Sequence, residues 1–174
     1  MPATQACSLL VDTSVRLLRQ AESLLEEIGR EEYAGSPPAI APHRVGGHLR
    51  HILEFYECFL DGVGSGSIDY DARKRDLAVE TDRTAAFAKT HSVGQRLLSG
   101  AFRDNMAVRV RMEDGECLLN SSVGRELQVL TSHTVHHFAL MALVLRTLGI
   151  RVDPDFGMAP STLRHLAEAA RCAQ

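Results

Sequence analysis

Hydrophobic residues recur every three or four positions along several stretches of the chain, and this spacing predicts amphipathic helices. The first covers residues 8–28, where leucines alternate with charged side chains until glycine and proline residues end the pattern. The second begins after Pro42 and ends at Gly62. A third, more highly charged helix is predicted for residues 69–99, although residues 90–92 could break it in two.

Two short segments with other patterns connect these helices. Residues 62–67 are rich in glycine and serine, which predicts a flexible connector. Residues 107–112 alternate apolar and polar positions, and residues 113–116 supply an Asp-Gly turn before residues 117–119. This second pattern predicts a β-hairpin.

The longest helix is predicted for residues 123–148. Ser121 or Ser122 can cap its start, and Gly149 can close its end in the left-handed conformation. A last helix is predicted for residues 161–172, after a proline that suits a first helical turn. The predicted fold class is therefore all-α, with a short β-hairpin before the fourth helix and an additional C-terminal helix.

Composition narrows the class of protein. A chain of 174 residues that is 45% apolar and 24% charged fits a single globular domain over residues 1–174. The formal net charge of -3 gives no broad positive field, which argues against nucleic acid as a partner. The longest apolar run, residues 138–145, is too short to cross a membrane, and the first residues do not resemble a secretion signal. The scattered cysteines favour reduced thiols and a cytoplasmic location.

Histidines on two of the predicted helices carry the candidate chemistry. His133 and His137 are four residues apart, so their rings project from adjacent helical turns toward one point. Apolar residues share that face, so the rings should point into the protein, where an unpartnered polar group is costly. Two histidines at this spacing are a weak indication of a metal site, and a third ligand is needed to make the indication specific. His51 is the best candidate, and His48, one turn earlier, could turn inward instead.

Three histidines would hold one divalent cation and leave coordination positions open for water or a substrate. Structural metal sites usually close with four protein ligands, so a set of three favours a catalytic site. Nickel, zinc, iron and copper all accept imidazole, and the residues alone do not distinguish between these metals.

Two further residues are candidate catalytic groups. Glu126 lies two turns before the histidine pair on the same stripe, where it could accept a proton from a ligand ring or act as a general base on metal-bound water. Alternatively, it is a first-turn carboxylate stabilised by the helix dipole. His48 could support a ligand, contact a substrate or bind the metal itself. In the charged segment 69–76, Arg73 or Arg75 could bind an anion, although local ion pairs are the more ordinary interpretation.

At these residues the sequence resembles the DinB superfamily of YfiT-like metal-dependent hydrolases, which carry one histidine on the second helix and an HxxxH pair on a later one. The segment His48-Leu49-Arg50-His51 with the aromatic residues after it is also similar to the iron-binding helical domain of the ergothioneine-synthesis sulfoxide synthases. That alignment makes His51 the ligand. The resemblance implies an up-down-down-up four-helix bundle, nickel or zinc in its core with iron as a further candidate, and homodimers.

The predicted function is accordingly a metal-dependent enzyme, either a hydrolase or a thiol-dependent transferase, acting at His51, His133 and His137. Its substrate would be a small molecule, and low-molecular-weight thiols are the first candidates, because family members include thiol-dependent enzymes. The alternative is a non-catalytic metal- or ligand-binding stress-response protein. A helical interaction module without metal is a third interpretation.

Overall fold

The structure is a computed structural model that describes residues 4–112 and 117–172. It is mostly helical, with a small three-stranded sheet. The elements of this described part, in chain order, are α1 (Thr4–Glu27), α2 (Arg30–Ala34), η1 (Pro38–Ile40), α3 (Val45–Gly62), η2 (Val63–Ser65), β1 (Ser67–Asp69), α4 (Leu77–Thr81), α5 (Arg83–Ser99), β2 (Ala107–Arg111), β3 (Leu119–Ser122), α6 (Val123–Thr147) and α7 (Pro160–Cys172).

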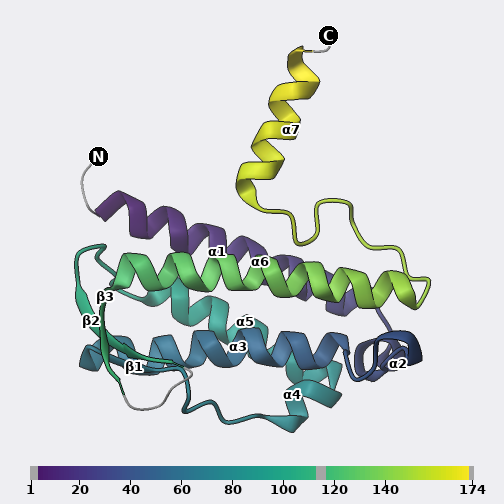
Figure 1. The fold of residues 1–174 in the computed structure, drawn as a ribbon, viewed down its shortest axis with the longest axis horizontal. Coiled ribbons are helices and arrows are strands. Elements are labelled where there is room, and N and C mark those ends of the chain that lie inside the picture. Colours follow the sequence, from purple (N-terminus) through teal and green to yellow (C-terminus); the bar gives the residue numbers. More distant parts are fainter. Residues whose placement is uncertain (1–3, 113–116, 173–174) are drawn as a thin grey trace.

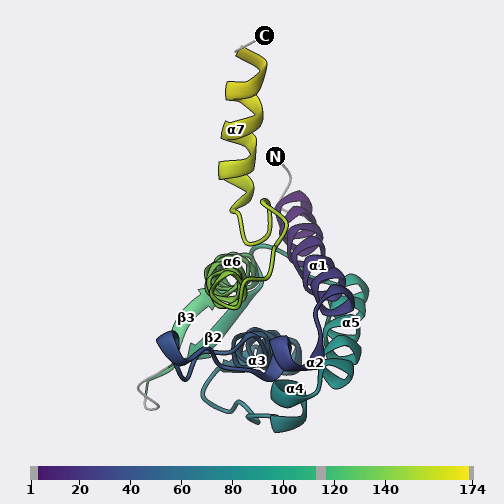
Figure 2. The same cartoon turned by 90° about the vertical axis from the view of Figure 1, so that its right-hand side faces the viewer.

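Four long helices make up the body of the molecule. Helix α1 packs against α5 and α6, and α3 packs against the same two helices from the other side. Figure 1 shows α3 running alongside α6, and Figure 2 shows α3 and α6 end-on with α1 and α5 beside them. Helix α7 stands away from this body, and it has no buried residue. No helix in the described ranges is both long and apolar enough to span a lipid bilayer.

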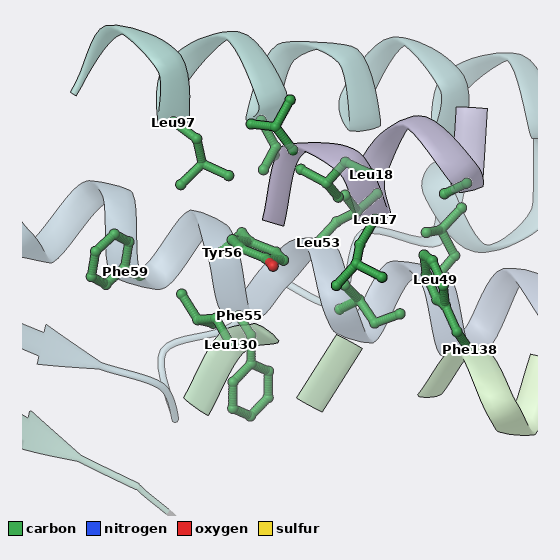
Figure 3. Close-up of a cluster of buried hydrophobic side chains, with 14 of the residues drawn as sticks. Leu17, Leu18, Leu49, Leu53, Phe55, Tyr56, Phe59, Leu97, Leu130 and Phe138 are labelled. Carbon is green, nitrogen blue, oxygen red and sulfur yellow. The ribbon is translucent and has the colours of Figure 1, made fainter. Parts of the chain in front are cut away.

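The centre between the long helices is filled by large apolar side chains, because each helix turns its hydrophobic stripe inward. Figure 3 shows members of this core from all four helices: Leu17 and Leu18 of α1, Leu49, Leu53, Tyr56 and Phe59 of α3, Leu97 of α5, and Leu130 and Phe138 of α6. These side chains are almost completely buried. The periodicity of the sequence therefore predicted the inward faces of these four helices correctly.

The small sheet corrects the expectation of an all-α fold. Strands β2 and β3 pair antiparallel, which confirms the predicted hairpin, although its turn at residues 113–116 lies outside the described residues. Strand β1 pairs parallel to β2 and was not predicted. It has only three residues, of which Ile68 alone is apolar and buried, so an alternating pattern could not appear in the sequence. Gly66, with a φ of 73°, makes the turn into β1.

The third predicted helix is shorter than expected and begins later. Residues 70–76 form no helix, and Asp76 and Asp82 cap α4 and α5 by accepting hydrogen bonds from the amides of Ala78 and Thr84. The possible break at residues 90–92 is absent from α5.

The fourth and last helices match their predictions closely. The hydroxyl of Ser122 accepts a hydrogen bond from the Arg125 amide at the start of α6. After the helix ends, Gly149 adopts a φ of 78°, in the left-handed region. Helix α6 therefore holds its histidines in the register that the sequence suggested.

Candidate metal centre

Three predicted ligands come together between α3 and α6. His51 lies on α3, and His133 and His137 lie one turn apart on α6. Each can offer one ring nitrogen such that the three atoms lie within 4.8 Å of one another. The ring centroids are 4.9 Å apart for His51 and His133, 4.7 Å for His51 and His137, and 4.4 Å for His133 and His137. We call these three residues the histidine cluster.

The histidine cluster is uncharged at neutral pH. Burial, followed by the neighbouring imidazoles and the positive charge of Arg73, lowers the pKa of His51 to about 4. Burial also lowers the pKa of His133 to about 4 and that of His137 to about 3. A metal ligand must offer a free lone pair, so rings that are already neutral bind a cation without first losing a proton.

One fully buried ring nitrogen in the histidine cluster makes no hydrogen bond within the described residues. It is the Nε2 atom of His133. Leaving such a group unsatisfied costs about 1–3 kcal/mol, so native proteins usually supply a partner. A bound cation would be such a partner, and three imidazoles on two adjacent helices suit a transition-metal ion. The residues present therefore fit a metal.

His48 lies beside the histidine cluster rather than in it. Its Nδ1 atom is 3.0 Å from Nδ1 of His137, so the two rings share a hydrogen bond. On its other side it stacks on His43, with ring centroids 5.4 Å apart. Burial lowers the pKa of His48 as well. This contact can fix the orientation of the His137 ring, while a catalytic role for His48 stays a prediction.

Glu126 lies two turns before His133 on α6 and is 5% exposed. Its carboxylate accepts hydrogen bonds from Tyr70, at 2.9 Å, and from the hydroxyl of Ser121, at 2.5 Å. No hydrogen bond joins it to a histidine in the described part of the chain. Glu126 therefore bonds to residues next to the small sheet, Tyr70 after β1 and Ser121 in β3. Its predicted catalytic role stays a prediction.

The sequence did not reveal the aromatic side chain next to the histidine cluster. The Phe55 ring stacks on His133, with centroids 4.4 Å apart, and lies 4.8 Å from the His51 ring. Figure 3 shows Phe55 and Leu97 on opposite sides of α3, and Phe55 is a buried member of the core. The Cζ atom of Arg73 lies 4.8 Å from the Phe55 centroid. Phe55 lies one turn after His51 on α3, and this spacing of four residues could have predicted that the two rings are neighbours.

An open cleft of about 370 Å³ borders the histidine cluster. Its lining is rich in histidine and arginine and includes His48, His51, His137, Arg44 and Arg50. Glu80 is the acidic residue of this lining, and both arginines pair with it, Arg50 at 2.9 Å and Arg44 at 3.7 Å. A small molecule could therefore reach two of the three histidines from solvent.

Comparison with known proteins does not assign the chain to a family. No family model matches the chain. The chain is similar to FK506-binding protein 5 of Rhizopus delemar, with 31% identity over 105 residues. The alignment covers 57% of this chain and 27% of the relative, so the chain spans about a quarter of the length of the curated relative that it matches.

This similarity corrects the function predicted from the sequence. The relative is named for binding FK506, which points away from a DinB-like metal enzyme. The prediction of a metal-dependent hydrolase or thiol-dependent transferase is therefore wrong, and the stress-response alternative is no better supported. The similarity also gives no support to DinB, hydrolase or metal binding as family attributes. The histidine cluster itself rests on geometry alone, and the resemblance to the DinB superfamily stays a prediction.

Proposed function

We propose that the histidine cluster binds one divalent transition-metal ion, and that the chain serves as a metal-dependent binding domain for a small molecule. The observation that carries this proposal is the convergence of three neutral imidazole nitrogens within 4.8 Å, on two helices that pack against each other. The unpartnered Nε2 of His133 supports it. Nickel and zinc are the first candidates, with iron as a third, because imidazole suits all three.

Three protein ligands leave at least one coordination position for an exchangeable ligand. The cleft beside His51 and His137 connects the histidine cluster with solvent. A low-molecular-weight thiol, as thiolate, and a small carboxylate are ligands that such an ion accepts. The proposed role is the binding of such a ligand, and no reaction is assigned to it.

Calorimetric titration of chelator-treated protein with Ni²⁺ and with Zn²⁺ tests the proposal. We expect one ion per chain. Replacement of His51, His133 or His137 by alanine should lower the affinity by roughly 100-fold or more, since each change removes one of three metal–nitrogen bonds. The control is His165→Ala, because His165 is an exposed histidine on α7, a helix with no buried residue. This control should bind metal as the wild type does.

Two results would contradict the proposal. One is wild-type protein that takes up no ion while its circular dichroism shows a folded helical chain. The other is equal metal affinity in the wild type and in the triple alanine variant, which would place the bound ion elsewhere on the chain.

We further propose that α1, α3, α5 and α6 form an up-down-down-up four-helix bundle and that the chain assembles as a homodimer. The packing of α3 and α1 on both α5 and α6 supports the bundle. The dimer follows only from the family resemblance, and light scattering of the purified chain at several concentrations tests it.

FK506 binding is a second candidate function, favoured by the match to the Rhizopus delemar protein. A cavity of about 370 Å³ lies between α1 and residues 152–156, with Leu24 and Phe156 as its apolar wall. Titration of the chain with FK506 tests this candidate, and Ser23→Trp, which places a large side chain in that cavity, should weaken binding. Unchanged binding in this variant would exclude the cavity as the site.

A further inference from the structure

Arg73 lies over Phe55, which contacts the histidine cluster, and it has no acidic partner among the described residues. It is half-buried in the segment between β1 and α4, and no aspartate or glutamate of residues 4–112 or 117–172 forms an ion pair with it. Its guanidinium lies over the face of Phe55, whose ring in turn contacts His51 and His133. The Arg50 guanidinium, by contrast, is held by both Glu54 and Glu80. Within the described residues, no carboxylate competes for the Arg73 guanidinium.

The charge around the histidine cluster is unbalanced. The cluster contributes three neutral rings, and the positive charge of Arg73 acts on His51 and His133. The nearby buried carboxylates are engaged elsewhere, Glu126 with Tyr70 and Ser121, and Glu54 with Arg50 and the Asp76 amide. With a divalent ion in place, this centre would hold excess positive charge that the described carboxylates do not neutralise. Partly buried charge of one sign attracts a ligand of the opposite sign.

We propose that the small molecule bound at the metal is an oxyanion, a carboxylate or a phosphonate, and that Arg73 pairs with it. One oxygen occupies an open position on the ion, while the guanidinium donates hydrogen bonds to another oxygen of the same ligand. The planar fork of arginine suits both oxyanions. Phe55 holds the guanidinium in place through its ring face, as cation–π contacts do. This inference rests on the proposed metal site and names the class of its ligand.

The test uses the full chain loaded with one equivalent of Co²⁺, because the visible absorption of this ion responds to a new ligand. Malonate and methylphosphonate are titrated in separate arms. Arg73→Met should weaken binding of the preferred anion by about 10- to 100-fold, the range expected for a lost charge-assisted pair. Lys74→Met is the matched control, because it removes the same charge from the adjacent, exposed position. It should bind the anion like the wild type.

The effect of Arg73→Met on the metal itself separates an anion-binding role from a merely structural one. Removing a positive charge near the cluster should leave Co²⁺ affinity unchanged or raise it a few-fold, while anion affinity falls. A variant that is simply damaged would lose both. Arg73→Lys, which keeps the charge but not the fork, should bind the anion with intermediate affinity.

Each outcome decides one proposal. If Co²⁺ is held and Arg73→Met binds both anions as the wild type does, the oxyanion proposal is wrong and the metal site stands. An Arg44→Met variant that alone loses anion binding would also overturn it, because the anion would then lie in the cleft on the other flank. If wild-type protein holds no Co²⁺, the metal site and this inference fail together.

Discussion

Helix α6 carries polar groups at two places, and they differ in how well their hydrogen bonds are satisfied. Near its start, the buried carboxylate of Glu126 accepts hydrogen bonds from Tyr70 and Ser121. Two turns later, the Nε2 atom of His133 is buried without a partner and faces two further neutral imidazoles. A buried polar group without a partner costs stability. Among the described residues, the Glu126 carboxylate has its partners, whereas the His133 nitrogen has none, and this difference supports the proposed metal site.

This contrast separates a structural polar cluster from a binding site on the same helix. Burial and the nearby carboxylate of Glu126 raise the pKa of Tyr70, so its hydroxyl stays a donor at all ordinary pH values. The Glu126 cluster thereby ties the segment after β1, the end of β3 and the start of α6 together. At the histidine cluster, ring contacts of His51 with His133 and His137 and the hydrogen bond between His48 and His137 join α3 to α6.

The largest expected effect is stabilisation by metal. At an ion concentration about 1,000 times the dissociation constant, binding to the folded state adds about 4 kcal/mol to the free energy of unfolding. For a chain of this size, that should raise the melting temperature by roughly 8–16 °C. Differential scanning calorimetry with and without Zn²⁺ measures the increase. Zn²⁺ should raise the melting temperature of Glu126→Ala as much as that of the wild type, and it should not raise that of His133→Ala. The reverse result would contradict the distinction drawn between the surroundings of Glu126 and those of His133.

Removal of the Glu126 carboxylate should cost about 2–4 kcal/mol of stability with or without metal. The Glu126→Ala change leaves the hydroxyls of Tyr70 and Ser121 without their acceptor and opens a small cavity at a buried position. Urea unfolding followed by circular dichroism measures the loss. The control is Glu27→Ala, which removes an exposed carboxylate of α1 and should change stability by about 0.5 kcal/mol or less. Equal losses in the two variants would show that Glu126 is not structural.

The sequence predicted the pair of His133 and His137 from a local signal, whereas the choice of His51 over His48 as the third member came from the family resemblance. A spacing of four residues places His133 and His137 on one face of any regular helix, and His51 stands out as a polar residue on an apolar helix. The ends of α6 were equally local, since Ser122 and Gly149 are adjacent to the residues they cap. Such features depend on neighbours in sequence and need no knowledge of the fold.

The partners of Glu126 could not be read from the sequence because they come from other elements. Tyr70 is 56 residues away, beyond a strand that was not predicted. The segment 69–76 was predicted to be helical, but residues 70–76 form no helix in the structure. The sequence therefore did not predict the contact between Arg73 and Phe55. Strand β1 forms only because β2 lies beside it, and a pairing across 42 residues leaves no periodic trace in three residues.

The hydrogen bond between His48 and His137 should affect metal affinity more than stability. His48→Phe keeps a ring next to His43 but removes the nitrogen that orients His137, so metal affinity should fall by about 10-fold, within the range seen when a partner of a metal ligand is lost. Calorimetric titration with Ni²⁺ measures the change. The control is His136→Phe, an exposed position next to His137. If both variants bind Ni²⁺ with wild-type affinity, the His48 contact has no supporting role.

A further expected effect is a dependence of stability on pH that arises at the histidine cluster. The folded chain keeps His51 and His133 neutral down to a pKa of about 4 and His137 to about 3, while unfolded histidines take up protons near pH 6.5. Between these values the unfolded state binds more protons, so metal-free protein should lose stability as the pH falls from about 7 to about 5.

Melting temperatures of the metal-free chain across this range measure the slope. His137→Gln removes the ring with the most strongly lowered pKa, so its slope should be shallower than that of the wild type, and the control is a substitution of the exposed His165 by glutamine. Glu126→Ala should lower stability by the same amount at both ends of the range. A slope that disappears in Glu126→Ala and persists in His137→Gln would place the proton uptake at the Glu126 cluster instead. The slope measures how much stability the folded chain loses at low pH because its histidine rings stay neutral. Neutral rings are the form that a cation binds, so the same slope measures how far the metal-free site is already in its binding form.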